Sequence, residues 1–401
     1  MSGIIDYLKK NDLLDFSFQY YFISFIHFIG YYSIERTHNP WIILFFLFGV
    51  VPVLDMVLPV DERNPTESEY KKLIKQNRFK VPLYLAIITD WMLYIWIIKK
   101  LLTGNNTIMC NIGLFINLTV AEAVCINLSH ELNHKTSLLS KFTGVTALIK
   151  NLNSHFIIDH NYYHHVWVST PTDTATSKLN QSIFSFIYGS MIGSYCHSWE
   201  LENKRCLETY GSKYNIHNFM IYSTLACVLF PFTGYYFYGI KGMILQIAVG
   251  LISSAILEII NYIEHYGLKR RFISPLGKYE NVTIHHSWNA PFRVSNYLLL
   301  KLQRHSDHHE NALKPYQVLA SYSESPCLPQ GYAVCLIIAV IPSIWFEVMN
   351  PLVELAAKKE KPSKELLDKV NAIIYRYVIY VLLVTFSLMS LSIYLDYDMI
   401  R

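Results

Sequence analysis

The sequence predicts an all-α integral membrane protein with six transmembrane helices, a histidine-rich cytosolic cap and a possible seventh, C-terminal transmembrane helix. Of the 401 residues, 52% are hydrophobic and only 16% are charged. Soluble domains usually carry about 25% charged residues, so this composition indicates a membrane protein. The histidines gather near the ends of the apolar runs rather than inside them, which predicts a polar cap at one side of the membrane.

Crossing the hydrocarbon core takes about 20 mostly apolar residues, and six runs of roughly this kind precede residue 270. The runs cover residues 16–34, 41–60, 81–98, 108–128, 219–237 and 243–262. Only short connections separate the first from the second run and the fifth from the sixth. We therefore expect two tight hairpins of membrane helices.

The distribution of Lys and Arg predicts the orientation of these helices. Residues 61–80, between the second and third runs, carry Arg63, Lys71, Lys72, Lys75, Arg78 and Lys80. The loops on the other side are poorer in basic residues, and positively charged loops stay in the cytosol. Residues 61–80 and 129–218, and the chain from Glu264 onward, are therefore expected to be cytosolic, and all histidine clusters fall in these segments.

The C-terminal part is expected to be an extension, residues 351–401, of a membrane domain formed by residues 1–350. Residues 378–395 contain no charge, which favours a seventh span, although a helix lying in the membrane interface is the alternative. Residues 1–15 are mixed polar, so we expect no removable signal peptide.

Net charge and cysteine spacing exclude several other classes of protein. The net charge of +4 is small and evenly spread, which argues against nucleic-acid binding. The seven cysteines form no C-x-x-C pair and no regular framework. Neither a zinc ribbon nor a disulfide scaffold is therefore expected, and the thiols are predicted to be free.

The densest histidine cluster lies in the stretch LQRHSDHH at residues 302–309. On a helix, His305, His308 and His309 occupy positions i, i+3 and i+4 and share one face. We expect them to converge on a single point. Because imidazole is the commonest metal ligand, the cluster predicts a metal site.

Three further clusters lie at or beyond the ends of predicted spans. The fourth span ends in two histidines at i, i+4 spacing, a second such pair with a neighbouring histidine follows residue 159, and the sixth span ends in one more. The nine candidate metal ligands are His130, His134, His160, His164, His165, His265, His305, His308 and His309.

Nine imidazoles exceed the six positions of an octahedral ion, and catalysis needs an open position, so we expect two metal ions. Nitrogen ligation suits iron, copper and zinc alike. Carboxylates next to the histidines can orient the free ring N–H groups from outside the coordination sphere, or form ordinary salt bridges. These carboxylates are Glu131, Asp159, Glu264 and Asp307.

The clusters resemble those of the membrane-bound alkane 1-monooxygenases, a branch of the membrane fatty-acid desaturase and hydroxylase superfamily. The resemblance is carried by HELNHK at 130–135, DHNYYHH at 159–165, NYIEHYGL at 261–268, HSWN at 286–289 and LQRHSDHH at 302–309. Shorter matches extend it over residues 54–319. NYIEHYG and LQRHSDHH are specific to this branch, whereas the C-terminal extension lies outside the resemblance.

The resemblance implies six transmembrane helices under a cytosolic di-iron site with histidine ligands. It also implies that dioxygen and two electrons insert oxygen into a terminal C–H bond of an alkane, an apolar substrate that reaches the site from the lipid membrane. The sequence departs from the family at Asp159, where Glu is usual, and at Tyr163, where Gly is usual. Both changes leave the ligands in place and bear on chain-length preference or reactivity.

The electrons are expected from a separate protein, because the chain contains no C-x-x-C pair and no G-x-G-x-x-G after a strand. The resemblance suggests rubredoxin with its reductase, or another small electron carrier. Lys269, Arg270, Arg271 and Lys278 offer a docking surface for an acidic carrier. The alternative is that they are ordinary basic residues of a cytosolic loop.

Three other functions fit parts of the pattern. HELNH at 130–134 has the H-E-x-x-H form of a zinc metalloprotease, but this function leaves five or six histidines without a role. A metal transporter would place its ligands within the spans. A desaturase or hydroxylase of fatty-acyl or lipid chains is the nearest alternative.

The remaining histidines are not expected to bind metal. His285 and His286 are expected near the metals without binding them. The others lack ligand spacing and are interpreted as interfacial or packing residues; they are His27, His38, His155, His197 and His217.

Overall fold

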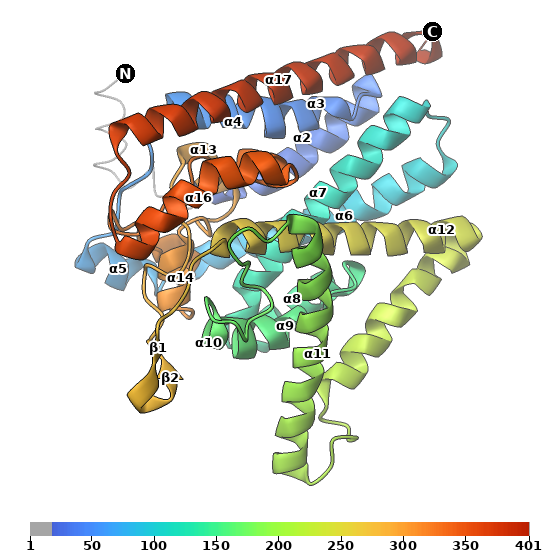
Figure 1. The fold of residues 1–401 in the computed structure, drawn as a ribbon. Coiled ribbons are helices and arrows are strands. Elements are labelled where there is room, and N and C mark those ends of the chain that lie inside the picture. Colours follow the sequence, from blue (N-terminus) through green and yellow to red (C-terminus); the bar gives the residue numbers. More distant parts are fainter. Residues whose placement is uncertain (1–17, 401) are drawn as a thin grey trace.

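The protein, seen here as a computed structural model that describes residues 18–400, consists mostly of helices (Figure 1). Within that range the only sheet is the antiparallel pair β1 (Phe272–Ile273) and β2 (Lys278–Tyr279). Residues 1–15, for which no signal peptide is expected, lie outside the described part, as do the first two residues of the first predicted span. The all-α class predicted from the sequence is confirmed.

The helices follow one another in this order: η1 (Phe18–Tyr21), α2 (Phe22–Thr37), α3 (Trp41–Phe45), η2 (Phe46–Val50), α4 (Val51–Val57), α5 (Glu67–Leu73), η3 (Asn77–Phe79), α6 (Lys80–Thr103), α7 (Ile108–Asn133), α8 (Leu138–Lys150), α9 (Phe156–Asp159), η4 (His160–His164), α10 (His165–Trp167), α11 (Ile183–Tyr210), α12 (Phe219–His265), η5 (Ser274–Leu276), α13 (Arg293–Leu298), α14 (His305–Glu310), η6 (Tyr316–Val318), α15 (Tyr332–Ala339), α16 (Pro342–Lys358) and α17 (Lys364–Ile400).

In the described part of the chain, four helical segments are long and apolar enough to cross a membrane: Asn77–Thr103, Ile108–Asn133, Phe219–His265 and Lys364–Leu395. The first two contain the third and fourth predicted spans. The third contains both the fifth and the sixth, and the last contains the possible seventh. The sequence thus located the long apolar helices correctly.

Helix α12 turns back on itself at Gly239, so its two arms correspond to the fifth and sixth predicted spans (Figure 1). Gly239 has φ 65° and ψ −158°, a backbone conformation that is essentially restricted to glycine. The arms also approach closely, because a Cβ built on Gly242 would lie 2.3 Å from the carbonyl oxygen of Gly234. Glycine at these positions is what allows the hairpin to close.

The second apolar run forms a shorter helix than the sequence suggested, whereas the first does not. Helices η1 and α2 follow each other directly from Phe18 to Thr37, and the helix that begins at Trp41 ends at Val57 instead of residue 60. Leu58 is extended because Pro59 follows it, and a residue before proline avoids the helical conformation. Within this helix η2 is a π-helical turn that ends two residues before Pro52, which has no N–H to donate.

A buried ion cluster joins α6, α7 and α8. Lys150, at the end of α8, donates hydrogen bonds to Asp90 of α6 and Glu122 of α7, and all three side chains are fully buried. A buried ion is tolerated only when it is paired. The cluster therefore fixes the point at which the chain leaves α8 and enters residues 151–165, which carry three of the candidate metal ligands.

The C-terminal helices pack on the rest of the protein. Helix α16 crosses residue 350, where the sequence suggested the start of an extension, and buries Trp345, Val348 and Met349 in a core that includes Tyr262 of α12. Helix α17 lies along α3 and η2 (Figure 1).

Candidate metal centre

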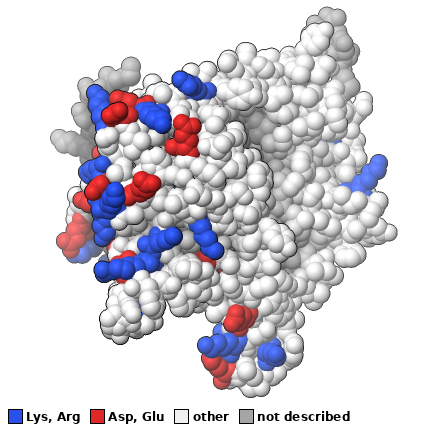
Figure 2. Space-filling model, in the orientation of Figure 1, with Lys and Arg blue, Asp and Glu red and all other residues white. Residues whose placement is uncertain are grey.

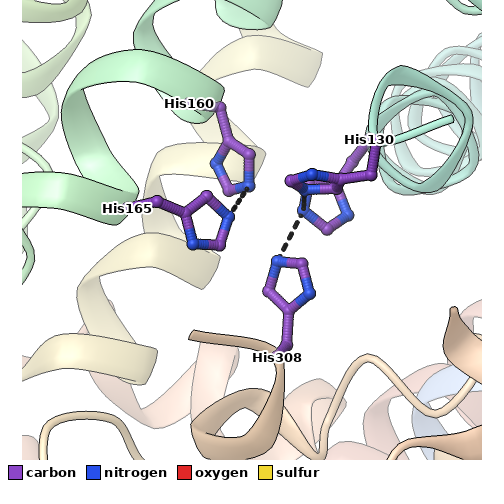
Figure 3. Close-up of side chains that lie close together, drawn as sticks. His130, His160, His165 and His308 are labelled. Atoms are coloured by element: carbon purple, nitrogen blue, oxygen red, sulfur yellow. Dashed lines mark hydrogen bonds between the residues drawn. The ribbon is translucent and has the colours of Figure 1, made fainter. Parts of the chain in front are cut away.

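All nine candidate ligands come together in two adjacent groups of imidazoles. Within each group the potential ligand nitrogens lie within 4.8 Å of one another. Figure 3 shows four members of the first group pointing toward a common space. The first group is His130, His134, His160, His165 and His308, and the second is His164, His265, His305 and His309.

The spacing of the nitrogen atoms fits a shared metal ion in each group. In the first group the Nε2 atom of His130 lies 3.0 Å from that of His308 and 3.1 Å from that of His134. In the second, the Nε2 atom of His305 lies 2.9 Å from that of His309 and 3.2 Å from that of His265. With metal–nitrogen bonds of about 2.1 Å, neighbouring ligands at right angles stand about 3.0 Å apart. One N–H donor also cannot satisfy several facing nitrogens.

A π-helical turn divides the second sequence cluster between the two groups. The backbone N–H of His165 bonds the carbonyl oxygen of His160, five residues earlier, as a π-helix requires. His160 and His165 therefore lie one turn apart, with their Nε2 atoms at 2.9 Å. His164, which the sequence paired with His160 at i, i+4 spacing, belongs to the other group.

The cluster on α14 is also divided, and the expectation that its three histidines converge on a single point is wrong. Successive residues of an α-helix are rotated by about 100°, so His308 and His309 point in clearly different directions. His309 stays with His305 in the second group, whereas His308 joins His130 in the first. Helix α14 thus contributes ligand candidates to both groups.

Burial keeps most of these rings neutral. Burial lowers the pKa of His134 to about 4 and lowers the pKa of His160 and of His308 well below the usual value. A neutral imidazole keeps a lone pair for a metal ion. Buried ring nitrogens without a hydrogen-bond partner among the described residues include His164 Nε2 and His309 Nδ1.

His164 differs because a carboxylate that the sequence did not indicate supports it. Its Nδ1 lies 2.9 Å from Asp173 Oδ2, and both side chains are buried. Burial by itself lowers the pKa of His164, but the charge and the hydrogen bond of Asp173, together with the charges of Asp159 and Glu264, outweigh this effect and raise that pKa. The contact leaves Nε2 directed toward the second group, a typical arrangement for a metal-binding histidine. Asp173 lies nine residues after His164 in an irregular loop, so no helical spacing signalled it.

Of the four carboxylates predicted to orient ligands, only Glu264 contacts a candidate ligand. Its Oε2 lies 3.3 Å from His305 Nε2, and its Oε1 accepts a 2.6 Å hydrogen bond from Tyr332. The hydrogen bond from Tyr332 thus holds the Glu264 carboxylate beside the second group.

The other three carboxylates have other partners. Glu131 bonds Lys135, Asp159 faces His197 at 3.6 Å, and Asp307 accepts a 2.6 Å hydrogen bond from the backbone N–H of Ala320. Because Glu131 faces Lys135 and not the histidines, the geometry gives no support to the protease interpretation.

A fully buried arginine holds the start of α14 in place. The guanidinium group of Arg304 donates to the carbonyl oxygens of Leu319 at 2.6 Å, Asp61 at 2.9 Å and Arg63 at 3.0 Å. It also forms an ion pair of 3.0 Å with the Asp61 carboxylate. Because Arg304 directly precedes His305, these bonds fix where the ligand-bearing helix begins.

A mostly apolar cavity of about 250 Å³ ends at both histidine groups. Its walls come from α2, α3, η2, α4, α6, α7, α9, α12, α13 and α15. The polar groups at the metal end are His130 and His160 of the first group and His305 and Glu264 of the second. The cavity can therefore direct one end of an apolar molecule between the two groups.

The remaining histidines lie outside both groups. His27 is buried, lines the cavity, and bonds Thr89 at 3.0 Å, and His155 faces Ser194 at 3.3 Å. His286 approaches Glu280 at 3.4 Å. His38 and His217 are exposed.

The chain is similar in sequence to several known proteins. The sequence model for the family described as fatty acid desaturase matches residues 106–337. Alkane 1-monooxygenase 2 of Alcanivorax borkumensis is 36% identical over 83% of this chain and 87% of its own length. Alkane 1-monooxygenases 2 and 1 of Pseudomonas aeruginosa are each 34% identical, over 78% and 77% of this chain and 84% and 81% of their own lengths.

Proposed function

Because the chain belongs to the alkane 1-monooxygenase family, within the fatty acid desaturase family, we propose that it hydroxylates the terminal carbon of alkanes with dioxygen and two electrons. The observation that carries this proposal is the apolar cavity that ends between the two histidine groups. An alkane has no polar group to bind, so shape and burial must position it. A cavity closed by metal-binding side chains at one end meets that requirement.

Each histidine group is proposed to hold one iron ion, giving a di-iron centre. The spacing of facing nitrogens supports one ion per group, and the rings of His165 and His309, one from each group, have centroids 4.5 Å apart. Bound there, the two ions would supply the activation of dioxygen. Family membership favours iron, since nitrogen ligation alone also suits copper and zinc.

The protein's own residues hold the alkane and keep water away from it. Val120, Val124 and Leu257 are among the apolar side chains that line the cavity. At the metal end, Tyr332 donates its hydroxyl proton to Glu264, which holds this carboxylate beside His305. The chain thus orients a terminal methyl group and limits access of water to the reactive end.

We further propose six membrane crossings before residue 270, with the metal centre on the cytosolic side. The two arms of α12 count as two crossings because the chain reverses at Gly239. In the view of Figure 2 the charged residues gather at the left and the bottom, while much of the right is uncharged, as expected for a cytosolic end and a membrane-embedded surface. Cysteine labels placed between residues 170 and 215 should then react only from the cytosol.

The electron carrier is proposed to be a separate acidic protein, such as a rubredoxin, that docks near the β1–β2 hairpin. Lys269, Arg271 and Lys278 are exposed there. Arg270 is engaged differently, since it donates 2.8 Å hydrogen bonds to the carbonyl oxygens of Val166 and Glu280 and ties the hairpin to the segment after His165. If docking is electrostatic, the rate at limiting carrier should fall as salt rises.

The decisive experiment combines metal analysis of the purified protein with product identification from alkanes, fatty acids and lipids. We expect close to two iron ions per chain and primary alcohols from alkanes, formed only when a reductase and a carrier are added. Products from acyl chains alone would favour the desaturase or lipid hydroxylase alternative. Alcohol formed from NADH by the isolated chain would contradict the need for a separate carrier.

A further inference from the structure

We propose that the C-terminal helix α17 determines which alkane chain lengths the cavity accepts, because it supports the wall of the cavity formed by η2. The inference rests on the proposed alkane hydroxylation and adds a role for a helix outside the stretches that resemble the family. It concerns a region of the molecule remote from the histidine groups. A variant can therefore change substrate selection without touching the metal centre.

The helix from Trp41 to Val57 lies between the cavity and α17. Ile43, Leu47 and Phe48 line the cavity on one side. On the other side, a Cβ built on Gly49 would lie 2.9 Å from the Leu382 side chain and 3.2 Å from the hydroxyl of Thr385. Both Leu382 and Thr385 belong to α17, so the cavity wall is a single helix thick at this point.

Two further contacts hold α17 against this helix and the residues that directly precede it. The rings of Phe45 and Phe386 have centroids 5.8 Å apart, and the side chain of Asn39 donates a 2.9 Å hydrogen bond to the carbonyl oxygen of Met389. Packed protein interiors resist displacement, whereas lipid chains are fluid. Helix α17 thus gives η2 a firm support that lipid would not provide.

The π-helical turn η2 depends on this packing against α17 for its position. A π-helical turn is wider than an α-helical turn and appears mostly as a single turn, often at functional sites. Pro52 follows it and removes one further backbone donor. The positions of Leu47 and Phe48 at the cavity therefore depend on what lies behind them.

The place of η2 along the cavity indicates which substrates are affected. The cavity follows α7 from His130 to Asn117, which is about 20 Å at 1.5 Å per residue. Asn117 donates a 2.7 Å hydrogen bond to the carbonyl oxygen of Pro40, so the start of the Trp41–Val57 helix marks the far end. Leu47 and Phe48 then lie roughly 10 Å from the histidine end, which an extended chain of about eight carbons spans with bonds of about 1.5 Å.

The test is the variant Gly49→Val, which pushes η2 away from α17 and into the cavity. We expect turnover of dodecane and hexadecane to fall at least about tenfold relative to octane, while iron content stays unchanged. Leu382→Ala removes the side chain that the new valine would meet. The double variant should therefore recover the wild-type ratio of long to short products, and Leu382→Ala alone should favour longer chains.

The matched control is Leu383→Ala, which removes the same side chain from the exposed face of α17 and should leave the product ratio unchanged. An unchanged ratio in both Gly49→Val and Leu382→Ala would overturn the inference, because α17 would then yield without moving the wall. A loss of turnover in Gly49→Val that is equal for all alkanes and is not rescued by Leu382→Ala would also overturn it. If wild-type protein makes no alcohol from any alkane, the proposed function fails instead, and the two failures are distinct.

Discussion

The protein contains two kinds of buried polar cluster, and they differ in whether their members complete one another. In the cluster of Lys150, Asp90 and Glu122, a cation faces two carboxylates, so opposite charges meet inside the protein. In the histidine groups, ring nitrogen atoms of neighbouring imidazoles face one another at about 3 Å, and carboxylates of the described residues contact only His164 and His305, through Asp173 and Glu264. Burial of polar groups alone therefore does not identify a binding site. A set of buried imidazole nitrogens that converge on one point does identify such a site, because a bound ligand is needed to satisfy them.

The largest effects are expected at the histidine groups, which, unlike the ion cluster, need a bound metal ion to complete them. Replacing His130, His164, His265 or His308 with Ala should reduce alcohol formation to background and lower the iron content, because each removes a ligand from a shared site. Each variant should still insert in the membrane, as measured by its recovery in membrane fractions. Full activity in any two of them would refute the ligand assignment.

The converse test concerns Lys150. In Lys150→Met two carboxylates stay buried without their cation, and breaking a buried ion pair costs about 3–5 kcal/mol. We expect a clearly lower melting temperature and a smaller yield of folded protein, with a normal iron content in the fraction that folds. The exposed Lys141 on the same helix gives the matched control, since Lys141→Met should be neutral. A stable Lys150→Met protein without iron would mean that the cluster belongs to the metal site.

A smaller effect should sharpen the distinction between ligands and the groups that orient them. Asp173→Asn keeps the size of the side chain but removes the charge beside His164, and loss of such a partner typically weakens metal binding about 10–100-fold. Iron should therefore be lost at a lower chelator concentration than in wild type. Asp368→Asn, on the exposed face of α17, is the control, and equal chelator resistance of the two variants would contradict a role for Asp173.

The smallest effects are expected at histidines outside both groups. His38→Ala and His217→Ala change exposed side chains, and such substitutions usually alter stability by less than about 0.5 kcal/mol. His217 stacks on the ring of Tyr210, so a slight loss of stability is expected there and none at His38. Activity and iron content should match wild type in both variants. A loss of iron in either would show that the groups extend beyond the nine histidines.

The sequence by itself determined the helical membrane class, the long apolar helices and the set of nine histidines. Hydrophobic runs and i, i+4 spacing are local properties, and local properties can be read along the chain. The positions of the helix ends were less certain. The second run ended early at Val57 because Pro59 follows, which is also a local signal.

Only the tertiary structure decided how the histidines are shared and what surrounds them. The π-helical turn places His165, and not His164, in the same group as His160. About 100° of rotation between successive residues of α14 places His308 and His309 in different groups. Asp173 supports His164 from an irregular loop, and α17 supports a wall formed more than 300 residues earlier. Such contacts join segments that are distant in the chain, and neither spacing nor composition records them, because they arise only when the helices pack together.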